Sequence, residues 1–241
     1  MKINLLMKKE EIDHKKIDDT KIAVVIDILM ATTSITAALA YGADSVIPVL
    51  NETEAIIEKK KYYEREVCLA GEDGGLVIDG FLNPVPSSLC SHVPGKKVIL
   101  STTNGTIAIR AAAQAKKTYA ASLLNGAAVA EEIVNQYRGE TVLIICSGSS
   151  KQFCLEDFYG AGHLINELMK LTDKKQLDLT DSAAGAALFY NAYINDAEWV
   201  LKGAKVGQML MKAELQEDIE FTSNKNTLIV VPKLSGHQII G

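Results

Sequence analysis

The sequence lacks the features that mark zinc fingers, disulfide scaffolds and membrane proteins. Its four cysteines (Cys68, Cys90, Cys146 and Cys154) show no C-x-x-C spacing, and its four histidines lie far apart, so a histidine-built metal site is not expected. No apolar run approaches the roughly 20 residues that span a bilayer. The first residues show no signal-peptide core. We therefore expect a cytoplasmic protein with reduced thiols and no membrane partner.

Positive charge is also scarce. The chain has 25 Lys and Arg residues against 30 Asp and Glu residues, and its lysines are scattered among acids. Without a basic stripe, a nucleic-acid partner is not expected. The 241 residues suffice for one domain spanning 1–241, although two lobes at about 1–95 and 96–241 are an alternative. The sequence leaves a homodimer open.

Short apolar runs alternate with helix-length segments along most of the chain. This alternation predicts an α/β fold with a mostly parallel sheet covered by helices. Strands are expected at 23–26, 45–50, 67–70, 97–100, 117–120, 141–146 and 227–231, and helices at 31–41, 52–63, 104–115, 127–137, 155–171 and, in pieces, 181–215. The proline-containing segment 80–95 is expected to be an irregular loop.

Two threonine-rich segments, 27–33 and 101–106, resemble each other. Each follows an apolar strand and opens a predicted helix. A duplicated α/β unit explains the similarity, and so does a chance likeness between strand-to-helix loops.

Polar residues gather just after the predicted strands. Ligands of open parallel sheets bind beyond the carboxyl ends of the strands, so we expect these residues to share one edge of the sheet. Helix N-termini, hydroxyls and amides can donate to a phosphate, and carboxylates can hold Mg²⁺ or act as nucleophile or base. A site for a small phosphorylated molecule is therefore predicted. Its candidates are Asp27, Thr32, Thr33, Glu72, Thr102, Thr103, Asn104, Asn125, Cys146, Ser147, Gly148, Lys151, Glu156 and Asp157.

Each candidate also has an ordinary structural interpretation. Asp27 and Asn125 are typical turn or cap residues, and Cys146 at the end of a buried strand suits an inert core thiol. Segment 147–150 is typical of a flexible turn, and the Glu156-Asp157 pair suits the first turn of a helix. The prediction of a site depends on their joint location.

Several common phosphatase signatures are absent. Gln152 stands where a cysteine-phosphatase loop starting at Cys146 requires arginine. Leu29 stands where the haloacid-dehalogenase pattern requires a second aspartate after Asp27. The chain has no Walker A motif, no G-x-G-x-x-G and no nucleophile elbow.

Taken in order, the segments resemble those of one phosphatase family. They include Val25-Ile26-Asp27 with Ala31-Thr32-Thr33, Gly71-Glu72, Thr102-Thr103-Asn104-Gly105-Thr106 and Leu155-Glu156-Asp157. In this order they resemble the 2-phosphosulfolactate phosphatase (ComB-type) family over nearly the whole chain.

That resemblance implies an α/β fold of its own class. It also implies Mg²⁺-dependent hydrolysis of a phosphate ester on a sulfonated hydroxy acid, giving sulfolactate and phosphate. By position it puts Asp27, Glu72, Asn104, Glu156 and Asp157 in or near the site. Asp27, Glu72 and Asp157 are the candidate metal ligands, and the four carboxylates are the candidates for nucleophile, acid and base.

Three positions depart from the family pattern, which usually has arginine there. This chain has Met30, Asp73 and Ile107. Arginine is the natural bidentate partner of phosphate, sulfonate and carboxylate groups. Two alternatives therefore stand beside the phosphatase hypothesis. One is a related enzyme with lyase or transfer chemistry on a less anionic substrate, and the other is a non-catalytic binding relative.

Overall fold

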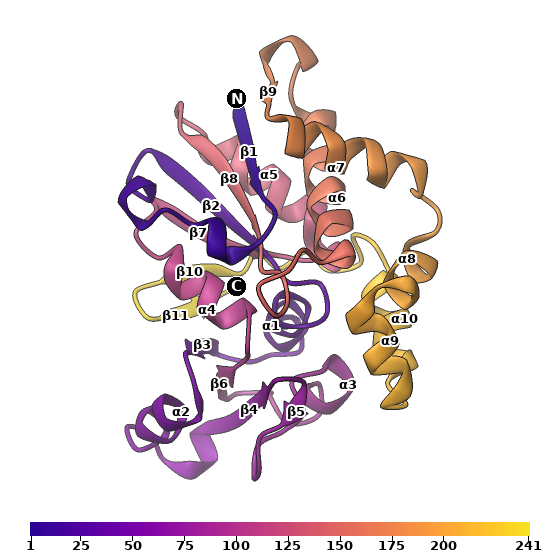
Figure 1. Ribbon diagram of the computed structural model, residues 1–241. Helices are drawn as coiled ribbons and strands as arrows, with labels where there is room; N and C mark the ends of the chain where they lie inside the picture. Colours follow the sequence, from indigo (N-terminus) through magenta and orange to yellow (C-terminus); the bar gives the residue numbers. More distant parts are fainter.

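Strands from both halves of the sequence interleave in one sheet of the computed structural model, which describes residues 1–241 apart from the side chain of Lys174 (Figure 1). The α/β fold with a mostly parallel sheet is confirmed. The eleven strands of the described residues follow the order β5-β4-β6-β3-β11-β10-β7-β2-β8-β1-β9. They are β1 (Lys2–Leu6), β2 (Lys21–Ile26), β3 (Ser45–Val49), β4 (Val67–Asp73), β5 (Leu76–Val77), β6 (Lys97–Ser101), β7 (Lys117–Ala121), β8 (Thr141–Cys146), β9 (Asp178–Leu179), β10 (Lys233–Ser235) and β11 (Gln238–Ile240).

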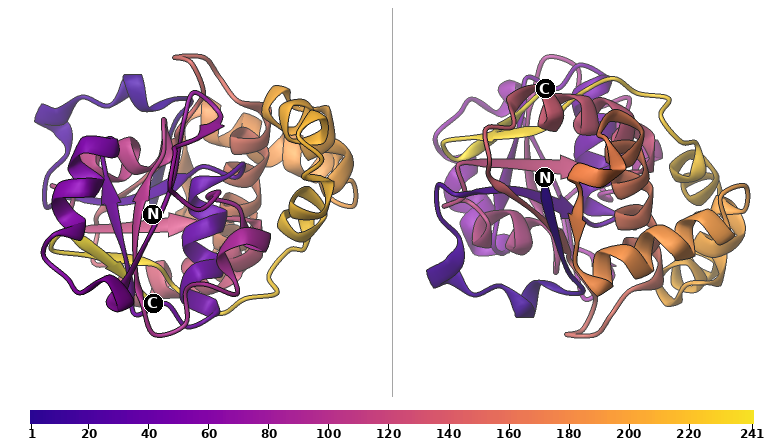
Figure 2. Two further views of the ribbon diagram at one scale, coloured as in Figure 1. Left: turned by 90° about the horizontal axis from the view of Figure 1, so that it is seen from below. Right: turned by 90° about the horizontal axis from the view of Figure 1, so that it is seen from above.

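Helices cover both faces of this sheet. They are α1 (Ala31–Ala40), α2 (Glu52–Lys59), α3 (Pro86–Leu89), α4 (Gly105–Ala111), α5 (Gly126–Gln136), α6 (Leu155–Leu171), α7 (Asp181–Ala192), α8 (Ala197–Gly203), α9 (Lys205–Lys212) and α10 (Gln216–Ser223). Helices α8, α9 and α10 lie at the periphery of the molecule (Figure 2). Across the described residues, no helix is both long enough and apolar enough to cross a bilayer.

The sheet consists of two parallel groups. Strands β4, β6 and β3 form one group, and β7, β2, β8, β1 and β9 form the other. The hairpin β10–β11 separates them through three antiparallel pairings, so the two groups run in opposite senses. Adjacent strands also twist by about 20–25°. The candidate residues at the ends of β2 and β8 belong to one group and those at the ends of β4 and β6 to the other, yet they line one cavity, so the expected gathering occurs between two opposed groups and not along a single parallel edge.

The core explains why the central strands are apolar on both sides. In β2, Ile22, Val24 and Ile26 pack in a cluster with residues of α5, α6 and α7. Ala23 and Val25 pack in a second cluster with residues of α1 and α4. A strand buried on both faces reads as a continuous apolar run, which is the pattern seen in the sequence.

Two segments differ from the sequence expectation. Residues 227–231 form no strand: Ile229 is 91% exposed, and Leu228 N–H bonds only to the Leu124 carbonyl of a 3-10 turn. The final two strands, β10 and β11, instead follow Pro232. Gly236 lies between them, and its positive φ of +63° allows the hairpin to turn. The expected loop 80–95 contains the one-turn helix α3, which starts at Pro86.

Candidate active site

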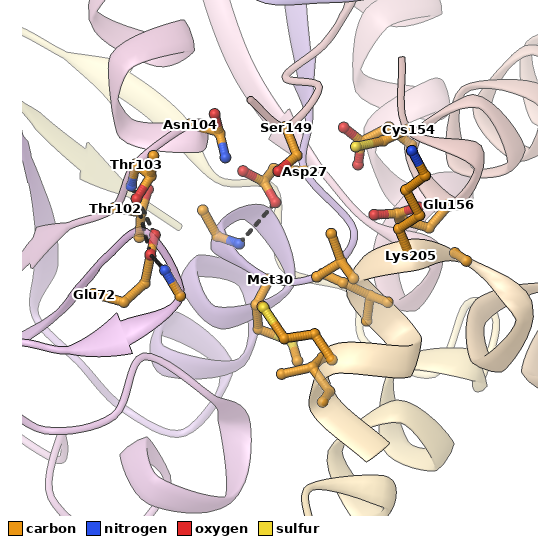
Figure 3. A pocket seen from close by; sticks show the side chains of 18 of the residues that line it. Asp27, Met30, Glu72, Thr102, Thr103, Asn104, Ser149, Cys154, Glu156 and Lys205 are labelled. Carbon is orange, nitrogen blue, oxygen red and sulfur yellow. Dashed lines mark hydrogen bonds between the residues drawn. The ribbon is translucent and has the colours of Figure 1, made fainter. Parts of the chain in front are cut away.

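A cavity of about 1050 Å³ lies where the ends of β2, β4, β6 and β8 face helix α9 (Figure 3). Eight of the residues predicted from the sequence line it. They are Asp27, Glu72, Thr102, Thr103, Asn104, Gly148, Glu156 and Asp157. The structure therefore brings the four candidate carboxylates into one pocket, although they come from distant parts of the chain.

Asp27 is held in place by the turn that leads from β2 into α1. Its Oδ1 accepts a hydrogen bond from Ala31 N–H at 3.2 Å. Thr32 lies behind it, where Oγ1 accepts from Asp27 N–H (3.0 Å) and donates to the Asp27 carbonyl (2.8 Å). Thr33 Oγ1 donates to the Ile28 carbonyl at 2.8 Å. Both threonines are fully buried and lie outside the cavity lining, so they shape the turn.

The loop after β6 repeats this arrangement. Thr106 Oγ1 accepts from Thr102 N–H (3.2 Å) and donates to the Thr102 carbonyl (3.0 Å). The similarity between segments 27–33 and 101–106 therefore corresponds to one hydrogen-bond device used at the ends of β2 and β6. The two loops meet at Gly105, where a Cβ atom would lie 2.6 Å from Asp27 Oδ2.

Glu72 joins the β4–β5 hairpin to the loop after β6. Its Oε1 accepts from Thr103 N–H (2.7 Å), and its Oε2 accepts from Thr103 Oγ1 (2.8 Å) and Gly75 N–H (2.7 Å). Thr103 Oγ1 in turn accepts from Gly74 N–H at 2.9 Å. Both oxygens of Glu72 are thus engaged by the protein, and this carboxylate holds two loops together.

Asp157 performs the same task in the other strand group. It lies in the first turn of α6, where Oδ1 accepts from Ile28 N–H (2.9 Å) and Oδ2 accepts from Gly148 N–H (3.0 Å). Its neighbour Glu156 is only 2% exposed and has the Cys154 thiol as its side-chain partner. Asp27 and Glu156 therefore have more free acceptor capacity in the pocket than Glu72 and Asp157.

Burial and mutual repulsion disfavour the charged forms of the clustered carboxylates. Desolvation raises the pKa of Asp27, and the charges of Glu72 and Glu156 raise it further. Desolvation, followed by the charges of Asp27 and Glu156, raises the pKa of Asp157, and desolvation raises the pKa of Glu156. These carboxyl groups therefore hold protons more readily than usual, and a cation that relieved their mutual repulsion would bind favourably.

Two lysines that the sequence did not single out lie at this site. Lys9 Nζ donates to Asn104 Oδ1 at 2.6 Å, and its charge lowers the pKa of Asp27. Asn104 makes no capping bond to α4, so its amide is directed by Lys9. Lys205, at the start of α9, lines the cavity and donates to Gln152 at 3.4 Å. Both lysines are remote in sequence from the strand-end motifs, so only the folded chain reveals them.

The remaining candidates do not line the cavity. Asn125 Oδ1 accepts from Ser122 N–H (2.8 Å) and its amide donates to the Val230 carbonyl (3.1 Å). Cys146 is fully buried, and desolvation raises its thiol pKa well above the usual value. Ser147 is buried, with no hydrogen-bond partner for its hydroxyl. Lys151 is exposed, and its carbonyl accepts from Lys8.

The three residues that stand where the family usually has arginine differ in their position relative to the cavity. Met30 lines the cavity, whereas Asp73 and Ile107 do not. The loss of positive charge from the cavity wall therefore occurs at one of the three positions.

The donor set of the pocket suits Mg²⁺. Within the described residues, no three Asp, Glu, His or Cys side chains are arranged to hold an ion by themselves. Mg²⁺ in phosphate-transfer sites is commonly held by one or two carboxylates together with substrate phosphate and water. Asp27 and Glu156 offer oxygen atoms for such a site, and the surrounding negative charge favours a divalent cation.

Comparison with known proteins agrees with this geometry. A family model described as 2-phosphosulpholactate phosphatase matches residues 6–237. A protein of Clostridium acetobutylicum is 37% identical over the full length of both chains, and one of Clostridium perfringens is 39% identical over 99% of this chain and 96% of its own. One of Carboxydothermus hydrogenoformans is 37% identical over 98% and 94%. All three are named probable 2-phosphosulfolactate phosphatase. The chain therefore belongs to the 2-phosphosulfolactate phosphatase family.

Proposed function

We propose that the chain is a Mg²⁺-dependent phosphoric monoester hydrolase acting on a small phosphorylated 2-hydroxy acid, with 2-phosphosulfolactate as the substrate that the family suggests. The observation that carries the proposal is the group of buried carboxylates, Asp27, Glu156 and Asp157, in one cavity with neutral donors. These are the oxygen ligands and donors that phosphoryl-transfer sites use.

The roles we propose follow from which oxygens are free. Asp27 is the principal metal ligand or nucleophile, because one of its oxygens is not used by the turn. Glu72 and Asp157 are further candidate ligands on the family resemblance alone, because both oxygens of each already accept hydrogen bonds that keep the loops in shape. When bound, Mg²⁺ supplies positive charge to the phosphoryl oxygens. Glu156, next to Asp157 on the same helical turn, is placed to transfer a proton at its carboxyl oxygens.

Neutral donors complete the phosphate site. Asn104 holds its carbonyl oxygen towards Lys9 Nζ, which orients the amide nitrogen as a donor. Gly148, after β8, also lines the cavity, but its N–H already donates to Asp157 Oδ2, so the next residue, Ser149, offers its hydroxyl as the second neutral donor. We propose that Asn104 and Ser149 bind phosphoryl oxygens without adding charge. Lys9 then serves as a positioning residue, because it acts through Asn104.

Phosphate release tests this function directly. Purified protein is assayed on 2-phosphosulfolactate and related phosphorylated hydroxy acids with Mg²⁺ and with chelator. Wild type should release phosphate only with the metal, and Asp27→Asn should lose at least about 100-fold in kcat/KM. The matched control is Asp19→Asn, at an exposed turn. Turnover that survives chelation, or full activity in Asp27→Asn, contradicts the proposal.

Domain organisation, oligomeric state and location belong with this proposal. We propose one domain over 1–241, because β6 lies between β4 and β3 in the sheet. A homodimer and a cytoplasmic location stay predictions, and light scattering of the purified protein tests the first.

A further inference from the structure

Part of the cavity wall is apolar. Leu76 and Val77 of β5, Phe153 of the loop before α6, and Met209 of α9 all line it. Their exposed fractions are 77%, 45%, 44% and 42%. Large apolar side chains left open to solvent and gathered in one place mark a binding surface. Here they belong to the same cavity as Asp27.

This apolar wall is continuous because α9 reaches the β4–β5 hairpin. Met209 Sδ and Cε lie 3.0 Å from the place where a Gly75 side chain would start. Met30, Val206 and Leu210 also line the cavity, and Figure 3 shows Met30 between the carboxylate side and α9. A ligand held at the carboxylates therefore has an apolar surface directly beside it.

The size of the cavity leaves room for a substituent on that surface. Its volume of about 1050 Å³ lies at the upper end of the range of pockets that enclose a drug-sized ligand, roughly 300–1,000 Å³. A phosphorylated hydroxy acid of a few carbon atoms fills only part of it. The remaining space is bordered by Leu76, Phe153 and Met209.

The charges indicate what kind of substituent fits there. Lys205 is the one cation among the side chains that line the cavity in the described part of the chain, against the carboxylates of Asp27, Glu72, Glu156 and Asp157. Lys205 can pair with the carboxylate of a hydroxy acid. A further strong anion placed against Leu76 or Met209 would find no cationic partner in the cavity lining and would lie in the same cavity as four carboxylates, which is unfavourable.

We propose that this pocket selects a phosphorylated 2-hydroxy acid with an apolar side chain, either aliphatic or aromatic. The phosphate lies at the carboxylates and the apolar group lies against Leu76, Phe153 and Met209. The inference rests on the proposed function for the phosphate end, and on the apolar wall for the substituent.

A matched substrate series tests the inference. It consists of phosphate esters of 2-hydroxy acids that differ only in the side chain, namely methyl, isobutyl, benzyl and sulfomethyl, the last being 2-phosphosulfolactate. For each ester, a non-hydrolysable analogue with CH₂ in place of the ester oxygen is measured for binding by calorimetry. We expect the benzyl and isobutyl compounds to exceed the methyl compound roughly tenfold or more in kcat/KM and in affinity.

Two methionines of α9 provide the matched variants. Met209→Gln should remove the preference for benzyl over methyl. Met211 lies on the same helix and is 39% exposed, but it does not line the cavity. Met211→Gln should therefore keep the preference. A loss of affinity that is equal for all side chains in Met209→Gln contradicts the inference.

The two readouts separate the two proposals. If no ester releases phosphate but the benzyl analogue binds tighter in a Met209-dependent manner, the phosphatase function fails and the apolar preference stands. If the esters are hydrolysed and the sulfomethyl compound equals or exceeds the benzyl compound in both readouts, the apolar preference is overturned and the phosphatase function stands.

Discussion

Gly105, the first residue of α4, is the position where one added methyl group should disturb the site most directly. A Cβ atom there would lie 2.4 Å from the Ala31 Cβ and 2.6 Å from Asp27 Oδ2. Carbon atoms in contact lie about 3.5–4.0 Å apart, so the loop after β6 or the turn at Asp27 must move by about 1 Å. The change Gly105→Ala therefore presses on the carboxylate proposed to act in catalysis.

The size of the effect follows from this displacement. Overpacking of a buried site costs about 1–3 kcal/mol of unfolding free energy. A displacement of about 1 Å near a catalytic group can reduce the rate about 100-fold. We therefore expect Gly105→Ala to fold with reduced stability and to lose about 100-fold in kcat/KM for phosphate release.

Gly185→Ala is the matched control for this variant. Gly185 lies in the interior of α7, and its added Cβ would meet only Phe158 Cζ, at 3.8 Å. Alanine in a helix interior gains about 0.5–1 kcal/mol over glycine, so this control should be as stable as wild type or more stable. Urea unfolding and phosphate release are measured on both. If Gly105→Ala keeps wild-type activity and stability, the close approach of the two loops does not position Asp27.

Three further predictions concern single side chains. Lys9→Met should lower kcat/KM about tenfold or more, since a hydrogen bond from a charged group is worth about 1.5–3 kcal/mol and Asn104 loses its partner, while Lys15→Met should not. Cys146→Ala should stay active, and iodoacetamide should not inactivate wild type through this thiol, because its raised pKa keeps it protonated. Desolvation lowers the pKa of His163 in the folded protein, so as the pH falls the imidazole is protonated in the unfolded chain before it is protonated in the folded one. The unfolding free energy of wild type, relative to that of His163→Gln, should therefore decrease below about pH 6.5, by up to about 1.4 kcal/mol per pH unit. Urea unfolding at several pH values measures this difference.

The sequence predicted the central strands and helices because their local signals agree with their burial. The apolar run at 141–146 is β8, and the helix expected at 155–171 is α6 with the same bounds. The prediction failed at 227–231, where an equally apolar run finds no strand to pair with. Pairing is decided by neighbours far away in the chain, and the short strands β5, β9, β10 and β11 carry too little local pattern to be recognised.

The candidate site was predicted in composition but not in geometry. The order of the sequence motifs predicted Asp27, Glu72 and Asp157 as site residues, and all three line the cavity. No local sequence pattern predicts that Lys9 and Lys205 lie at the site. Their positions depend on how the β1–β2 connection and α9 pack against the strand ends. The same holds for the opposed senses of the two strand groups, which follow from the pairings of the last two strands.

The carboxylates of the site also have a structural task, and this links activity to stability. Glu72 binds two loops within one strand group, and Asp157 binds the loops after β2 and β8 within the other. The two groups meet where Gly105 packs on Asp27 and where Lys9 donates to Asn104.

Removing one of these carboxylates leaves buried N–H groups without an acceptor, at about 1–3 kcal/mol each. An alanine variant of Asp157 would therefore lose activity for either reason. Asp157→Asn keeps an oxygen acceptor for one of the two N–H groups and removes the charge. Loss of Mg²⁺ binding in Asp157→Asn, with less loss of unfolding free energy than in Asp157→Ala, would therefore assign Asp157 a role in metal binding beyond its structural one.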